Sequence, residues 1–145
     1  MIEERDRGGE SPCFAHLVDD LDAHPSPVRV VASNTILYTD RWSEVTAFYR
    51  TGLGLRPTME RDWFIEFELY AGVHVSVADA SRASIVSGDG AGLTLSWRVP
   101  DSLACRRQLV QNGVAVSPIQ KRWGAPGFFV TDPAGNRIEF WSERQ

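Results

Sequence analysis

Two kinds of apolar periodicity alternate along the chain and predict a repeated order of strands and helices. Short stretches rich in β-branched and aromatic residues predict strands, and apolar residues recurring every three to four positions predict helices. The first set comprises a strand over 28–39, a helix that Asp40 caps and Gly52 ends, and strands over 55–59, 63–70 and 73–78. The second set comprises a strand over 93–99, a helix from Pro100 to Asn112, and strands over 114–117, 128–131 and 136–141. The offset of roughly 60 residues between the sets indicates an internal duplication.

This duplication predicts an α+β fold built from two tandem βαβββ modules. Each module is expected to cover the convex side of its sheet with its own helix, so that a curved mixed sheet surrounds a shared cleft on its concave sides. The expected boundaries are 28–80 for the first module, 81–92 for a small, polar, glycine-containing linker, and 93–145 for the second module. The chain is about one domain in length, so both modules belong to one domain overall.

The segment before the first module, residues 1–27, predicts a loose charged tail followed by a short amphipathic helix. Ser11 and Pro12 suit a helix start, and Pro25 and Pro27 end the pattern. The apolar side of this helix consists of Phe14, Leu17, Val18 and Leu21. Such a stripe must dock on another surface, either on its own domain or on a second subunit.

Charge and cysteine content narrow the classes of partner. A net charge of −4 and a pI near 5.3 argue against a nucleic-acid partner, because no basic stripe could neutralise phosphates. No apolar run approaches the roughly 20 residues of a membrane span, and the acidic N-terminus lacks the form of a signal peptide. Cys13 and Cys105 have no CxxC partner, so we expect neither a disulfide framework nor a zinc site, and a reducing cytoplasm is the expected compartment.

A hairpin near the end of the chain places a carboxylate opposite an apolar face. Residues 132–136 form the expected turn between two strands. On the return strand, Arg137, Glu139 and Trp141 share one face, while Ile138 and Phe140 share the other. Glu139 is therefore a candidate functional residue.

The repeated pattern and two motifs resemble the vicinal oxygen chelate superfamily over about residues 28 to 142. The residues that carry the resemblance are the segment 40–55 with its Phe48-Tyr49 and Gly52-Leu53-Gly54-Leu55, and the ending Asp132-Pro133-Ala134-Gly135-Asn136 followed by Glu139. This superfamily includes glyoxalase I, extradiol dioxygenases and bleomycin-resistance proteins. The resemblance implies a glyoxalase-like domain, a homodimer and, in metal-dependent members, ligands on the first and last strands of each module. Carried over to this chain, those ligand positions hold Asn34, Ser76, Thr94 and Glu139.

These residues make a degenerate metal site. An amide and two hydroxyls are poor ligands for a divalent metal, which needs imidazole or carboxylate donors. The expectation is therefore no metal and no cofactor. A divalent metal is the alternative, and it would need help from His74, Glu66 or Glu68 on neighbouring strands.

The expected cleft has a mixed polar and aromatic lining of the kind that binds drug-sized organic molecules. The candidate ligand-binding residues are Asn34, Tyr38, Trp63, His74, Ser76, Thr94, Ser96, Trp123, Glu139 and Trp141. For the three tryptophans, core packing is an equal alternative, and for Glu139 the alternative is a salt bridge with Arg137 or Arg98.

Two hypotheses about function follow. The first is a metal-independent protein of the bleomycin-resistance type that binds a small organic molecule, either an antibiotic or a metabolite. The alternative is an enzyme, either a divergent metal-dependent lyase, isomerase or dioxygenase, or a metal-free catalyst that uses Glu139 and His74 as acid and base. Whether the protein is an enzyme stays open from the sequence.

Overall fold

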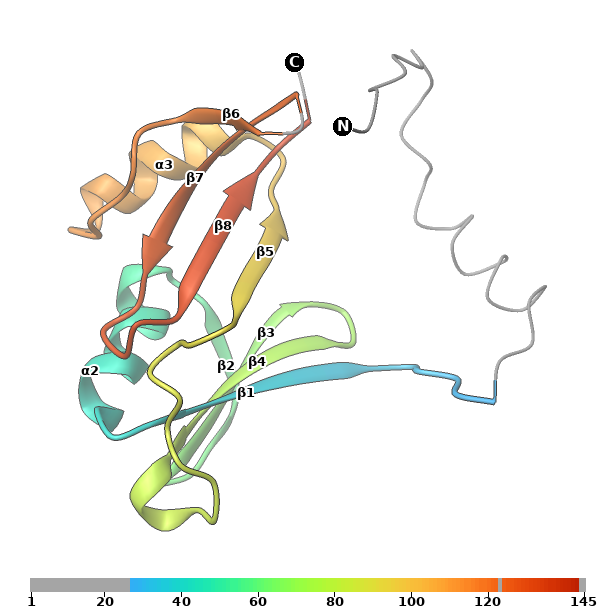
Figure 1. The fold of residues 1–145 in the computed structure, drawn as a ribbon, viewed down its shortest axis with the longest axis vertical. Coiled ribbons are helices and arrows are strands. Elements are labelled where there is room, and N and C mark those ends of the chain that lie inside the picture. The colour runs from blue at the N-terminus through green and yellow to red at the C-terminus, as the bar shows by residue number, and fades with distance from the viewer. Residues whose placement is uncertain (1–26, 123, 144–145) are drawn as a thin grey trace. The chain divides into compact units, whose positions relative to one another are not determined.

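The structure is a computed structural model that describes residues 27–122 and 124–143 (Figure 1). The chain divides into a unit of residues 1–31 and a compact unit of residues 32–145, and the second unit contains the described helices and strands. The helix expected before the first module and the side chain of Trp123 lie outside the described residues.

The first module forms a four-stranded mixed sheet with the strand order β1-β4-β3-β2. Its elements are β1 (Ser33–Thr39), α2 (Trp42–Ala47), a π-helical turn η1 (Phe48–Gly52), β2 (Arg56–Glu60), β3 (Phe64–Tyr70), β4 (Val73–Asp79) and a 3-10 turn η2 (Ala80–Arg82). Strand β1 runs parallel to β4, and the other neighbours are antiparallel.

The second module repeats this arrangement with the strand order β5-β8-β7-β6. Its elements are β5 (Thr94–Arg98), α3 (Ser102–Gln111), β6 (Gln120–Arg122), β7 (Ala125–Thr131) and β8 (Arg137–Trp141). Strand β5 runs parallel to β8, as β1 does to β4. The predicted α+β fold of two tandem βαβββ modules is therefore confirmed, with one four-stranded sheet in each module.

Three local predictions were wrong. The first strand begins at Ser33 instead of residue 28, and residues 28–31 are exposed. Asp40 does not cap α2; the hydroxyl of Thr39 instead accepts a hydrogen bond from the backbone N–H of Arg41.

The strand expected over 114–117 is replaced by β6 further along the chain. The backbone N–H of Val114 donates to the carbonyl of Leu109 and so completes the end of α3. Ser117 donates its backbone N–H to the carbonyl of Phe129 at 2.9 Å, and Pro118, which has no N–H, follows it before β6 begins.

The core lies on the helix-facing side of both sheets. Alternate residues of the strands are buried there, and helices α2 and α3 contact β4 and β7. The core strand residues are Leu37, Ile65, Phe67, Val75, Val77, Leu95, Phe128, Val130, Ile138 and Phe140. Tyr49 from η1 is fully buried among them. Period-two alternation thus leaves the opposite face of each sheet for other roles.

We call the opposite face of the first sheet the first open face, and the opposite face of the second sheet the second open face. The first open face consists of Asn34, Ile36, Tyr38, Phe64, Glu66, Glu68, His74 and Ser76. The second open face consists of Thr94, Ser96, Arg98, Gly127, Phe129, Arg137, Glu139 and Trp141. The face assignments made for these strands from sequence alternation agree with the observed strand register.

A polar network joins the two modules. The hydroxyl of Tyr49 donates to Oδ2 of Asp132 at 2.8 Å, and both side chains are buried. Asp132 also accepts hydrogen bonds from the backbone N–H groups of Ala134 and Asn136, each at 2.9 Å, and from the Asn136 side chain at 2.8 Å. A second bond runs from the side chain of Asn112 to the carbonyl of Gly52 at 2.9 Å. The closing turn therefore also anchors the first module.

Candidate functional site

Two of the predicted site residues are bonded to each other on the first open face. Ser76 Oγ donates to Asn34 Oδ1 at 2.8 Å. Parallel pairing of β1 with β4 sets Asn34 opposite His74 and Ile36 opposite Ser76, so the two polar side chains meet diagonally. Ser76 is fully buried, and this bond satisfies its hydroxyl.

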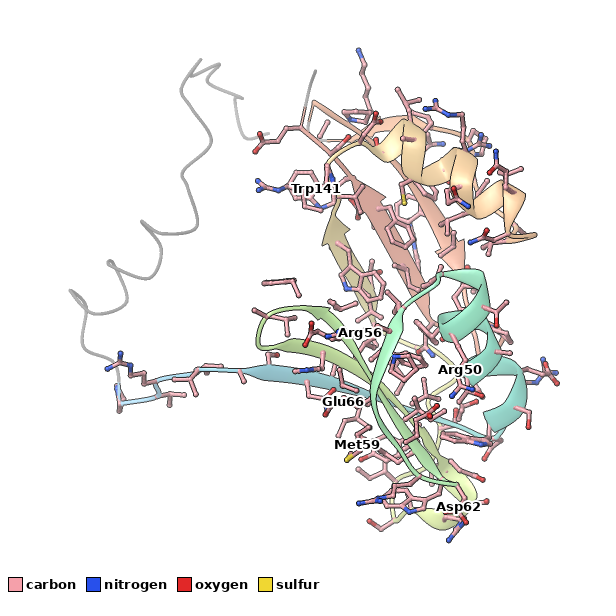
Figure 2. All side chains as sticks on the ribbon, turned by 180° about the vertical axis from the view of Figure 1, so that it is seen from behind. Arg50, Arg56, Met59, Asp62, Glu66 and Trp141 are labelled. Carbon is pink, nitrogen blue, oxygen red and sulfur yellow. The ribbon has the colours of Figure 1, made fainter. Side chains whose placement is uncertain are left out.

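An imidazole and a carboxylate lie side by side on the same face. His74 Nε2 is 3.7 Å from Glu66 Oε1, and both side chains are largely buried. Glu66 also accepts a hydrogen bond from Thr58 at 2.9 Å. The neighbouring Glu68 is paired with Arg56 at 3.1 Å (Figure 2). This face therefore holds His74 next to Glu66 and, at its edge, the ion pair of Arg56 with Glu68.

Glu139 stands at the centre of the second open face. Antiparallel and parallel pairing place it between Phe129 on β7 and Ser96 on β5. Among the described residues, Glu139 makes no hydrogen bond and no ion pair. Glu139 is half-buried, and its oxygens are not among the buried side-chain atoms, so the carboxylate is open to a ligand.

The two arginines that could have neutralised Glu139 are engaged elsewhere. Arg98 Nη1 bonds Oε1 of Glu143 at 2.9 Å. The guanidinium carbon of Arg137 lies 3.7 Å from the centre of the Phe129 ring, in a cation–π contact. The salt bridge considered for Glu139 in the sequence analysis is therefore not formed with either residue.

The tryptophans divide between core and surface. Trp42 and Trp97 pack against the core. Trp141 lies on the second open face opposite Gly127. Trp63 is 37% exposed and contacts Phe64 at the start of β3. Trp141 thus shares a strand and a face with Glu139, two residues away.

The predicted residues fall into two groups on separate sheets. Asn34, Tyr38, His74 and Ser76 belong to the first sheet, and Thr94, Ser96, Glu139 and Trp141 belong to the second. Figure 2 shows Glu66 and Trp141 on the two different sheets. Within the described ranges no hydrogen bond or ion pair links one group to the other, and His74 and Glu139 are not bonded to each other.

Sequence reasoning missed two residues of the second open face. Phe129 and Gly127 lie opposite Glu139 and Trp141. The signal was available, because alternation from the buried Phe128 places both of its neighbours on the other face.

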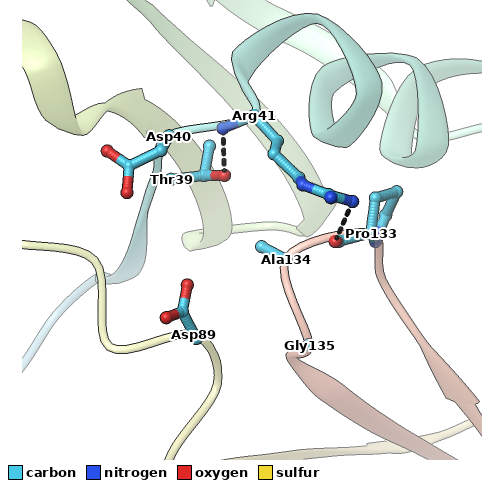
Figure 3. A pocket seen from close by; sticks show the side chains of 7 residues that line it. All are labelled: Thr39, Asp40, Arg41, Asp89, Pro133, Ala134 and Gly135. Carbon is cyan, nitrogen blue, oxygen red and sulfur yellow. Dashed lines mark hydrogen bonds between the residues drawn. The ribbon is translucent and has the colours of Figure 1, made fainter.

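Two cavities lie near the closing turn. The larger, of about 450 Å³, is lined by Thr39, Asp40, Arg41, Asp89, Pro133, Ala134 and Gly135. In it Asp40 and Asp89 project from different segments, and Arg41 donates a hydrogen bond to the carbonyl of Pro133 at 3.4 Å (Figure 3). The smaller cavity, of about 150 Å³, is lined by Ile36, Leu37, Tyr38, Val86, Gly88, Gly90, Ala91, Leu93 and Asn136. Of the predicted site residues, these two cavities include Tyr38 alone.

The residues at the superfamily's ligand positions do not fit a divalent metal. Asn34 and Ser76 are hydrogen-bonded to each other, Thr94 offers a hydroxyl, and Glu139 is the one carboxylate of the four. In the part of the chain that the structure describes, no three His, Cys, Asp or Glu side chains come close enough to hold an ion. Amide and hydroxyl oxygens alone give a weak set of donors.

The sequence matches the model of the Glyoxalase/Bleomycin resistance protein/Dioxygenase superfamily over residues 30–140. The chain belongs to this superfamily. The vicinal oxygen chelate resemblance is therefore confirmed. A search among curated proteins finds no match. Among the described residues, no helix combines the length and the apolar character needed to cross a membrane.

Solved structures of the superfamily share the fold. A lactoylglutathione lyase from Agrobacterium tumefaciens is 18% identical, with a TM-score of 0.64 over 81% of this chain and 96% of its own. A bleomycin-binding protein from Streptomyces verticillus, complexed with copper(II)-bleomycin, is 16% identical, with a TM-score of 0.63 over 81% and 99%. An antibiotic binding protein from Streptomyces sp. CB03234 is 17% identical, with a TM-score of 0.66 over 83% and 100%. At these identities the similarity shows the fold alone.

Proposed function

We propose that this superfamily member is a metal-independent protein that binds a small organic molecule, an antibiotic or a metabolite, on its open faces. The observation that carries the proposal is the unpaired carboxylate of Glu139 beside the aromatic surface of Trp141. A ligand that donates a hydrogen bond to Glu139 would replace the water that the carboxylate loses on burial. Structural neighbours that bind bleomycin or another antibiotic support this class of function.

We also propose that the protein forms a homodimer and acts in a reducing cytoplasm. An open face provides one wall of a binding site, and small-molecule sites are concave and enclose most of the ligand. A second copy would supply the facing wall and cover exposed apolar side chains such as Ile36, which is 39% exposed. Cys105 is a free thiol, in keeping with a reducing compartment.

Ligand titration with metal analysis tests this function. The purified protein, prepared without chelators, is titrated with metal-free bleomycin and with planar aromatic antibiotics while its tryptophan fluorescence is followed. We expect saturable quenching that is unchanged by EDTA, and metal well below one equivalent per chain. A stoichiometric divalent metal, with binding lost on chelation, would instead support the metal-dependent lyase, isomerase or dioxygenase.

The His74–Glu66 pair favours a second candidate function, a metal-free catalyst that moves a proton. Their 3.7 Å separation is longer than a hydrogen bond, so Glu66 would have to approach His74 to orient it as a general base. In that case His74→Gln would abolish turnover of the bound molecule and leave its affinity nearly unchanged. Equal product formation by the wild-type protein and by His74→Gln would exclude a catalytic role for His74.

A further inference from the structure

We propose that the second open face selects ligands in which a short chain joins an aromatic ring to a positive charge, as in arylalkylamines. This inference rests on the proposed function and names the chemical class of its ligand. It is carried by the charges, the aromatic surface and the spacing of residues on strand β8.

Glu139 provides a negative charge on this face, while Arg137 keeps its positive charge with its guanidinium stacked on the Phe129 ring. Glu139 has no partner among the described residues, whereas both nearby arginines have one. Arg98 is drawn toward the edge of the sheet by Glu143, and Arg137 lies over the Phe129 ring. An ammonium or guanidinium group can form a charge-assisted hydrogen bond with Glu139, while a carboxylate would meet repulsion.

The surface for the ring is the flat area formed by Trp141 and Gly127. The two residues lie directly opposite each other on β8 and β7. A Cβ at position 127 would be 3.2 Å from the Trp141 Cβ and 2.9 Å from the carbonyl oxygen of Phe140, so a side chain there would crowd both. Glycine therefore leaves one flank of the indole open to a stacked ring.

The spacing of the two features sets the length of the ligand. Glu139 and Trp141 are separated by one residue on the same face of β8, which places them about 7 Å apart. An ammonium group three bonds from an aromatic ring, hydrogen-bonded to the Glu139 carboxylate, leaves the ring within reach of the Trp141 side chain. Ser96, opposite Glu139, is a small side chain that leaves room for the connecting atoms.

Calorimetric titration with three indoles of similar shape tests the inference. The probes are tryptamine, which is cationic, tryptophol, which is neutral, and indole-3-propionate, which is anionic. We expect the full-length protein to bind tryptamine about tenfold more tightly than tryptophol, the effect of one partly exposed charge-assisted hydrogen bond, and indole-3-propionate most weakly.

Two variants and a matched control test whether the preference for tryptamine arises from the second open face. Glu139→Gln keeps the shape of the side chain and removes its charge, so it should bind tryptamine and tryptophol with about equal affinity. Trp141→Leu should weaken tryptamine and tryptophol alike. Glu44→Gln makes the same charge change on exposed helix α2 and should leave all three affinities unchanged.

The outcomes separate this inference from the proposed function. Equal affinity for the three probes, or a tryptamine preference that survives Glu139→Gln, overturns the inference while binding itself stands. Bleomycin binding without any indole binding also overturns it. Absence of binding by every indole and every antibiotic overturns both.

Discussion

Asp132 illustrates how one buried side chain can hold a turn and a neighbouring module together. It is 3% exposed and accepts four hydrogen bonds, one of them from Tyr49 in the first module. All buried polar side-chain atoms of the described residues have a partner. Removing one donor therefore leaves the buried carboxylate with one hydrogen bond fewer, in a place that water does not easily reach.

Tyr49→Phe should lower the free energy of unfolding by about 1 to 3 kcal/mol, because it removes a buried hydrogen bond to a carboxylate. Chemical denaturation at neutral pH measures this difference. Tyr38→Phe is the control, since the Tyr38 hydroxyl has no hydrogen bond among the described side chains. An equal loss of stability in Tyr49→Phe and Tyr38→Phe would contradict a stabilising role for the Tyr49–Asp132 hydrogen bond.

The same tyrosine predicts how stability depends on pH. Burial raises the pKa of Tyr49 above its ordinary value of 10.0, and the Asp132 carboxylate raises it further. Above pH 10 the unfolded chain releases this proton and the folded chain keeps it. The stability contributed by Tyr49 is therefore full below pH 10 and falls above it, by up to about 1.4 kcal/mol per pH unit.

Denaturation of wild type and Tyr49→Phe at pH 8 and pH 11 measures this linkage. The advantage of wild type should shrink at the higher pH. A constant advantage across this range would mean that Tyr49 ionises in the folded protein at its ordinary pKa.

At the scale of elements, the two helices begin in different ways. Asp101 accepts a hydrogen bond from the backbone N–H of Ala104 at 3.0 Å and caps α3. Helix α2 has no side-chain cap, although Asp40 occupies the corresponding place in the sequence. The sequence predicts a cap at Asp40, and this was wrong because capping depends on a backbone angle at the strand end that local composition does not specify.

Asp101→Ala should destabilise the protein by about 1 kcal/mol through loss of this cap. Asp40→Ala should change stability by less than about 0.5 kcal/mol, because the exposed Asp40 caps nothing. Thermal denaturation of the two variants side by side gives the comparison. A larger loss for Asp40→Ala would restore the capping role expected from the sequence.

At the scale of the whole molecule, the segment between the modules packs closely against the closing turn. A Cβ at Gly90 would lie 2.1 Å from the carbonyl oxygen of Gly135, and Gly90 has a φ of +79°. Asp89, just before it, also has a positive φ of 52°. The backbone of this segment therefore contacts the turn that Asp132 organises.

Gly90→Ala should lower the free energy of unfolding by more than about 2 kcal/mol, because both the contact and the backbone angle exclude a side chain. Gly88→Ala is the matched control, since nothing lies within 4 Å of its added Cβ. Urea denaturation of both variants provides the measurement. Equal stabilities would mean that the segment can move away from the turn at little cost.

Much of the architecture follows from patterns that repeat along the chain. Period-two alternation predicts that Glu139 and Trp141 share a face, and the repeated element order predicts the two sheets. The partners of individual charges do not follow from these patterns. Arg137 stacks on Phe129 instead of pairing with Glu139, and this choice depends on side-chain packing across strands that are distant in sequence.

The bond between Asn34 and Ser76 has a consequence for descent within the superfamily. Replacing Asn34 by histidine would leave the buried Ser76 hydroxyl without its acceptor before any metal could bind. Replacing Ser76 first would leave the amide without its donor in the same way. Either single substitution should therefore lower the free energy of unfolding by about 1 to 3 kcal/mol before a second ligand is in place.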